Sequence, residues 1–204
     1  MIIEWLSAFL AVAGTLAAVL RLQNRSLFMK VGVLAFLAGV MAVPIGGLYL
    51  FQYLLTVAGH ISITSMIMLG CSLVRRLTGK DAFVEGERGL LLAAIFIAGL
   101  AVYAATFELT QFNIYQFGFG SLTFAVLLMA SALVLLYTGR KAFALIIATS
   151  VLAYDLHLLP SSNLWDHLLD PLLWFYALGG LAWNAIRNTI DRRRLGAIPI
   201  AESL

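Results

Sequence analysis

Long apolar stretches fill most of this chain and limit what it can fold into. A membrane-spanning helix needs about 20 consecutive apolar residues, and seven segments meet or approach that length: 3–21, 28–43, 48–74, 88–107, 119–138, 141–158 and 164–187. Only 11% of the residues are charged, against about 25% in an average soluble domain. The sequence therefore predicts an all-α, polytopic protein with seven transmembrane helices, located as a multi-pass protein in a cell membrane, with a bacterial inner membrane as the expected one.

The basic residues test this layout, because they fall on one side of it. When the sides of the membrane are numbered alternately, all 13 Lys and Arg residues lie on the same side: Arg21, Arg25, Lys30, Arg75, Arg76, Lys80, Arg88, Arg140, Lys141, Arg187, Arg192, Arg193 and Arg194. The positive-inside rule makes that side cytoplasmic, which places the N-terminus outside and the C-terminus inside. The small net charge of +3 gives no reason to expect a nucleic-acid partner.

Similar landmarks recur in the two halves of the chain. Arg25 and Arg140 are 115 positions apart, and Pro44 and Pro160, which end the second and sixth segments, are 116 positions apart. This spacing predicts a parallel 3+1+3 duplication. The expected division is a first three-helix repeat at 1–80, a linker helix and outer loop at 81–118, a second repeat at 119–190 and a cytoplasmic tail at 191–204.

The 3+1+3 layout with an outer N-terminus resembles the SWEET sugar facilitators and the PnuC-type vitamin transporters. The resemblance covers the whole chain as architecture and implies a transporter. The Pro-Gln dipeptide of the wider group is absent, because Pro44 is followed by Ile and Pro160 by Ser. A Trp-Asn pair occurs at Trp183 and Asn184, near the inner end of the last segment. No binding residue is transferred from the families.

Ionisable residues gather in the stretch 153–177, which joins the last two segments. Counted at 1.5 Å per helical residue from the basic ends, five ionisable residues share one layer in the outer third of the membrane: Glu4, His60, Asp155, His157 and Asp170. An ionisable group that faced lipid at this depth would cost a few kcal/mol. We therefore expect these groups to face one another, a water-filled vestibule or the membrane interface. Asn163 is the expected N-cap of the last helix, and Asp166 and His167 are expected to serve mainly in capping near the interface.

The leading interpretation of this layer is a transporter or facilitator for a small polar or cationic solute. The candidate substrate-binding residues are Glu4, His60, Asp155, His157, Asp170, Trp174, Tyr176 and Asn184. No cofactor, catalytic residue or bound metal is expected under this interpretation. The expected partners are membrane lipid and the solute, with a homo-oligomer or other membrane subunits also allowed.

Two other functions remain open. The compact chain is also typical of a non-catalytic subunit of a larger membrane complex. Alternatively, His60, His157 and His167 lie in the same outer half and would be the Zn²⁺ ligands of an intramembrane lipid hydrolase. Enzymatic activity is expected only in this last case.

Overall fold

The computed structural model describes residues 1–109, 111 and 113–196, and this part of the chain is almost entirely helical. The α-helices are α1 (Ile2–Val19), α2 (Leu27–Met41), α3 (Leu50–Ala58), α4 (Ile63–Thr78), α5 (Glu87–Thr106), α6 (Leu122–Tyr137), α7 (Lys141–Asp155), α8 (Leu164–Leu168) and α9 (Pro171–Gly196). Two short 3₁₀ helices and two short strands complete it: η1 (Leu22–Asn24), η2 (Ile114–Gly118), β1 (Pro44–Ile45) and β2 (Leu48–Tyr49). The all-helical class predicted from the sequence is confirmed.

Polar side chains set the start of several helices. Ser26, Ser62 and Ser121 each accept a hydrogen bond from the amide three residues later, at the first turns of α2, α4 and α6. Asn163 accepts from the amide of Trp165 and caps α8, the short helix before the last one, so it is an N-cap as predicted but not that of the last helix, which begins at Pro171. These caps satisfy amides that have no partner within their own helix.

The connection between α2 and α3 is a small antiparallel hairpin. Pro44 pairs with Tyr49 and Ile45 pairs with Leu48. The two residues between the strands, Gly46 and Gly47, have φ angles of 58° and 89°. A two-residue hairpin turn of this kind needs positive φ at both positions, which glycine adopts without strain.

The prediction of seven transmembrane helices is wrong. Within the described residues, only Ile2–Val19 and Glu87–Thr106 are both long and apolar enough to cross a membrane. Leu27–Met41 and Leu122–Tyr137 are apolar but shorter, with 15 and 16 residues. At 1.5 Å per residue, such helices are roughly 22–24 Å long, against a hydrocarbon core of about 30 Å. The membrane depths predicted for the ionisable residues assumed seven full spans, so they are no longer supported.

Two of the predicted spans are interrupted, which explains part of this error. The stretch 48–74 contains the break between α3 and α4, where Gly59 adopts a φ of 73°. The stretch 164–187 contains the break between α8 and α9, where Leu169 is extended and Pro171 begins the next helix. Residue hydropathy does not detect such breaks because the residues around them remain apolar.

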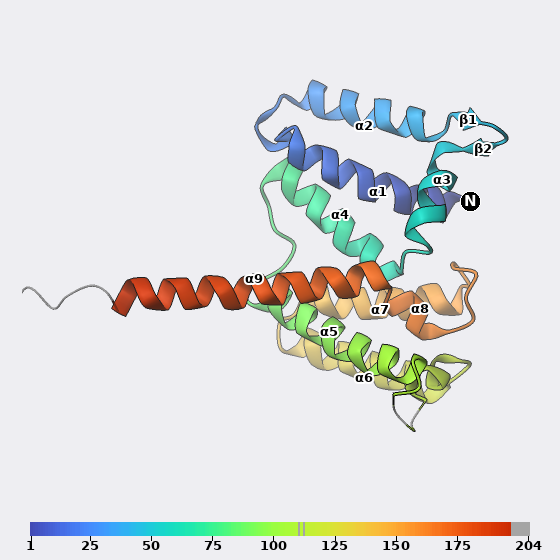
Figure 1. Cartoon of the computed structure of the whole chain (residues 1–204), viewed down its shortest axis with the longest axis vertical. Coiled ribbons are helices and arrows are strands. Elements are labelled where there is room, and N and C mark those ends of the chain that lie inside the picture. Colours follow the sequence, from blue (N-terminus) through green and yellow to red (C-terminus); the bar gives the residue numbers. More distant parts are fainter. Residues whose placement is uncertain (110, 112, 197–204) are drawn as a thin grey trace, which may run out of the picture.

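The helices form two groups with separate hydrophobic cores. One core contains side chains of α1 to α4, including Ala13, Leu37 and Leu73. The other is built mainly from α5 to α9 and includes Leu91 and Ile146. Figure 1 shows α1 to α4 on one side of the long helix α9, with α5 and α6 on the other side. A third, smaller cluster, which includes Ile61, Met66, Ala153 and Leu159, joins the two groups.

The predicted division of the chain at 80, 118 and 190, and the duplication behind it, stay predictions. The linker helix of that division, α5, packs in the same core as α6, α7 and α9. Of the predicted tail at 191–204, the structure describes only the end of α9 to Gly196. Residues 197–204 lie outside the described residues.

The connections that carry basic residues lie at one end of the molecule. Figure 1 shows the α1–α2, α4–α5 and α6–α7 connections at the end toward which α9 extends. Lys30 donates to the carbonyl oxygen of Leu77 at 2.6 Å, and Arg140 donates to that of Glu85 at 3.0 Å. These two bonds tie the three connections together.

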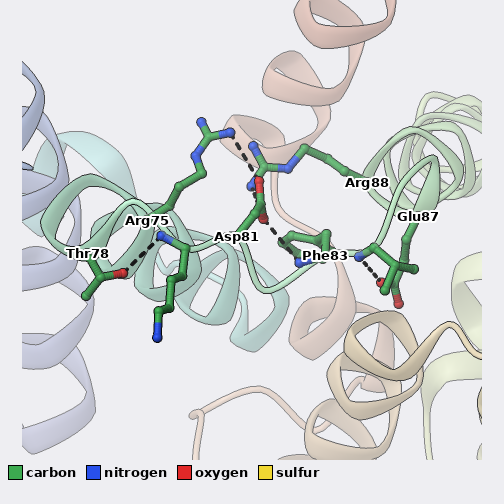
Figure 2. Close-up of polar contacts among 8 residues, drawn as sticks. Arg75, Thr78, Asp81, Phe83, Glu87 and Arg88 are labelled. Carbon is green, nitrogen blue, oxygen red and sulfur yellow. Dashed lines mark hydrogen bonds and ion pairs between the residues drawn. The ribbon is translucent and has the colours of Figure 1, made fainter.

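The α4–α5 loop holds a carboxylate between two arginines (Figure 2). Asp81 lies 3.3 Å from Nη1 of Arg75 and 3.4 Å from Nη2 of Arg88. Burial acts to raise the pKa of Asp81, but the amide of Phe83 and the two guanidinium groups outweigh it and hold that pKa below its ordinary value. Arg88 also lies over the ring of Phe83, with 5.0 Å between the guanidinium carbon and the ring centroid.

Candidate functional site

A cavity of about 380 Å³ lies where the two broken helices meet α5. Its polar and aromatic lining comes from eight of the described residues: His60, Tyr103, Thr106, Tyr115, Ser161, Trp165, Asp166 and Asp170. The lining identified in the described part of the chain contains two carboxylates and a histidine but no Lys or Arg. The volume lies within the range of small-molecule sites, roughly 300–1,000 Å³.

Asp170 is the most strongly held polar group of this site. Its side chain is only 5% exposed. Its Oδ2 accepts three hydrogen bonds: from the amide of Ser62 at 3.0 Å, from the hydroxyl of Ser62 at 2.7 Å and from the hydroxyl of Ser65 at 2.5 Å. Its Oδ1 accepts from the amide of Leu173 at 2.8 Å. The carboxylate therefore caps the first turn of α9 and holds Ser62, the N-cap residue of α4, in place.

The local sequence explains why two helices begin at this point. Pro171 is in the first position of α9, where its missing N–H removes no hydrogen bond from the helix. Ser62 precedes α4 and caps it through Ser65 N. The positive ends of both helices thus face one carboxylate, which offsets the cost of its burial.

Asp166 lies on α8 and accepts hydrogen bonds from residues of two connections. The hydroxyl of Tyr115 lies 3.1 Å from each of its carboxylate oxygens, and Ser161 donates to Oδ2. Burial raises the pKa of Tyr115, and the charge of Asp166 and its hydrogen bond add to that rise. The phenol therefore stays protonated and acts as a donor toward the carboxylate.

The wall formed by η2 is fixed to α8 by backbone contacts. Asn163 donates through Nδ2 to the carbonyl oxygen of Tyr115 at 3.0 Å, and Trp165 donates through Nε1 to that of Ile114 at 3.1 Å. Gly118 makes this approach possible, because a Cβ at that position would overlap the Asn163 side chain. The aromatic wall is thus held in place independently of any ligand.

Of the predicted binding residues, the structure brings Asp170 and His60 together at this cavity. His60 is exposed and also lines a second opening of about 510 Å³, together with Glu4 and Pro160. Glu4 forms an ion pair with the N-terminal amino group at 3.2 Å. It belongs to the neighbouring opening and is not part of the lining identified for the main cavity.

Two predicted residues, Asp155 and His157, lie on an exposed turn at the end of α7. His157 has a φ of 52°, and its Nδ1 is 2.8 Å from the carbonyl oxygen of Asp155. Neither residue lines a cavity found among the described residues. The sequence placed them at the correct connection, but the turn points them to the surface.

The three remaining candidates lie on α9, away from this lining. Trp174 packs α9 against α5, where it donates through Nε1 to the carbonyl oxygen of Phe96 at 3.1 Å. Tyr176 is 52% exposed and lines a different cavity, described below. Asn184 is exposed on α9.

The proposed zinc ligands do not meet. Among the described residues, no group of three His, Cys, Asp or Glu side chains could hold a metal ion. His167 is fully buried, its Nδ1 lies 3.2 Å from the carbonyl oxygen of Asn163, and its ring stands edge-on to Tyr154. Burial lowers the pKa of His167, so it is neutral at pH 7.

Sequence reasoning missed the two tyrosines and the two serines of the site, and it assigned Asp166 to capping and not to binding. Ser62 directly precedes an apolar run, and Ser65 lies three residues later, within the first turn of that run. A serine before an apolar run is typical of a helix N-cap, so the sequence did contain a signal for these two residues. Tyr103 and Tyr115 carry no such signal, because they come from α5 and η2 and reach the site only through tertiary packing.

The chain was also compared with known proteins. No family model, no curated protein and no solved structure matches it. The architectural resemblance to the sugar and vitamin transporters therefore stays a prediction.

Proposed function

We propose that this chain is a multi-pass protein of a bacterial inner membrane that binds a small organic cation in the 380 Å³ cavity and carries it across the membrane. The observation that carries the proposal is the pairing of Asp166 and Asp170 in a cavity lined by aromatic rings, with no Lys or Arg in the lining identified for the described residues. Two helices long and apolar enough to cross a membrane support a membrane location.

The chemistry of the lining favours a cation over an anion or a neutral sugar. The carboxylates supply negative charge, and the faces of Tyr103, Tyr115 and Trp165 supply the electron-rich surfaces that attract ammonium groups. An anion would be repelled by two carboxylates, and the lining identified for the described residues contains no Lys or Arg to offset this repulsion. A monovalent ammonium ion is therefore the ligand class that this cavity suits best.

The break between α8 and α9 supports movement rather than static binding. Interrupted helices at a binding site are typical of transporters, in which the freed helix ends and unwound backbone bind the solute between bundles that move against each other. Asp170 lies at this break and binds the start of α4, which belongs to the other helical group. Rearranging this contact would change how the two groups pack.

The two alternatives receive less support. The hydrolase would need a metal cluster, and the described residues contain none. A structural subunit would not require a carboxylate pair in an aromatic cavity.

The test is uptake of labelled tetramethylammonium into proteoliposomes, with glucose as the neutral arm. We expect uptake of the cation only, and a loss of at least tenfold with Asp166→Asn and with Tyr103→Leu, which removes an aromatic face from the cavity. Glu85→Gln, an exposed carboxylate on the α4–α5 loop, is the matched control and should transport normally. Equal entry of glucose, or full activity of Asp166→Asn, would contradict the proposal.

A further inference from the structure

A second cavity, of about 210 Å³, lies between α4, α9 and α1 and is separate from the solute site. The two helices α4 and α9 start together at Asp170 and diverge from there, as Figure 1 shows. The cavity fills the angle between them. Its apolar lining includes Ala11, Ile61, Met68, Leu69, Leu172 and Leu173.

The cavity is long and has a polar end. Ser65 and Ser72 both line it and are seven positions apart on α4, which corresponds to roughly 10 Å along the helix, and Ile61 extends the lining beyond the start of α4. Arg88 lines the cavity from the first turn of α5, at the basic end of the molecule. A molecule that fills this space needs an apolar body and one polar end.

The charge at the polar end is positive. Arg75 and Arg88 share the single carboxylate of Asp81, so this cluster keeps a net positive charge (Figure 2). The Nε of Arg88 is buried and has no hydrogen-bond partner within the described structure. Arg88 also lies at the N-terminus of α5, where the helix itself favours an anion.

We infer that this cavity binds one acyl chain of an anionic phospholipid, with the phosphate at Arg88. The apolar walls between α4 and α9 take the chain, and the guanidinium group takes the headgroup. The side chains of the two helical groups do not fill the space between α4 and α9, and the bound lipid occupies that space and contacts both groups. This site goes beyond the solute site and uses different residues, so either can be wrong without the other.

The experiment measures lipid binding to delipidated, detergent-solubilised protein by native mass spectrometry. Phosphatidylglycerol and phosphatidylcholine with the same chains are compared, together with inorganic phosphate. We expect phosphatidylglycerol to bind about tenfold more tightly than phosphatidylcholine. Both lipids carry the phosphate, but the trimethylammonium group of phosphatidylcholine meets a cationic cluster at this end, and the loss of one favourable charge contact is worth about that factor. Arg88→Gln should remove the difference, and Arg25→Gln, an exposed basic residue of the same charge, should keep it.

A second variant covers the case in which Arg88→Gln disturbs the loop. Leu69→Trp fills the cavity without changing charge, and it should weaken both lipids by a similar factor. The inference is overturned if phosphate alone binds as tightly as phosphatidylglycerol, if Arg25→Gln has the same effect as Arg88→Gln, or if Leu69→Trp leaves the binding of both lipids unchanged.

Discussion

Asp170 is expected to be worth more to stability than any other single polar side chain of the site. Its carboxylate accepts four hydrogen bonds, from two backbone amides and two hydroxyls, at the starts of α4 and α9. Loss of a helix N-cap costs about 0.5–2 kcal/mol, and Asp170→Ala removes an acceptor from two helices at once. It also leaves the buried amides of Ser62 and Leu173 without an acceptor, at about 1–3 kcal/mol each.

These costs overlap, because the cap energy includes part of the lost hydrogen bonds. We therefore expect Asp170→Ala to lower the free energy of unfolding by about 3–5 kcal/mol. Asp170→Asn keeps the shape and one carbonyl oxygen but loses the charge, so we expect a cost of about 1–2 kcal/mol. Ser65→Ala removes one hydrogen bond to a charged group and should cost about 1.5 kcal/mol.

The assay is reversible unfolding of the detergent-solubilised protein in increasing SDS, followed by far-ultraviolet circular dichroism. A double-mutant cycle between Ser65→Ala and Asp170→Asn isolates their interaction, and residues in direct contact should couple by at least about 0.5 kcal/mol. Glu4→Ala is the control, because its exposed ion pair should contribute at most about 1 kcal/mol. A cost below about 1 kcal/mol for Asp170→Ala, or additive effects in the cycle, would refute the shared cap.

Two further predictions concern packing and pH. Gly99→Ala should destabilise the protein by about 1–3 kcal/mol, because the new methyl group overlaps the Trp174 ring. Gly14→Ala meets nothing within 4 Å, so it should be neutral or stabilise the protein by up to about 1 kcal/mol through helix propensity. Thermal melts of both variants check this prediction, and equal effects on the melting temperature would contradict it. Because the pKa of His167 is lowered in the folded state, the unfolded chain binds more protons, so stability should be complete above about pH 6.5 and fall as the pH drops. His167→Gln should flatten this slope in pH-dependent unfolding, and an unchanged slope would show that another group causes it.

The sequence was sufficient to predict helices and the grouping of polar residues near the last connection. Apolar runs, serine and asparagine caps and the Asp170-Pro171 pair are local signals, and each marks a helix or its start. The number of spans was not predictable in the same way. Hydropathy averaged over a window does not register that Gly59 and the residues before Pro171 interrupt a continuous apolar run.

The site was predictable only where its residues carry a charge in an apolar context. Asp170 and His60 were found for that reason. Tyr103 and Tyr115 look like ordinary interior or interfacial aromatics in the sequence, and the packing of α5 and η2 against α8 is what brings them to the carboxylates. Asp155 and His157 carry the same signal as Asp170, but the left-handed turn at His157 leaves them at the surface.

The two buried carboxylates of the described structure, Asp170 and Glu87, share one arrangement. Glu87 accepts from the amide of Val84, just before α5 (Figure 2), and from the amide of Phe143 in the first turn of α7 at 2.9 Å. Each carboxylate thus joins the start of its own helix to the start of another, with amides and helix dipoles in place of a cation. The difference is that Asp170 also lines the 380 Å³ cavity, whereas the Glu87 side chain is fully buried within the described structure. A chain that needed only a joint between helices could bury both carboxylates completely, so the access to Asp170 is the feature that distinguishes a binding site from a structural joint.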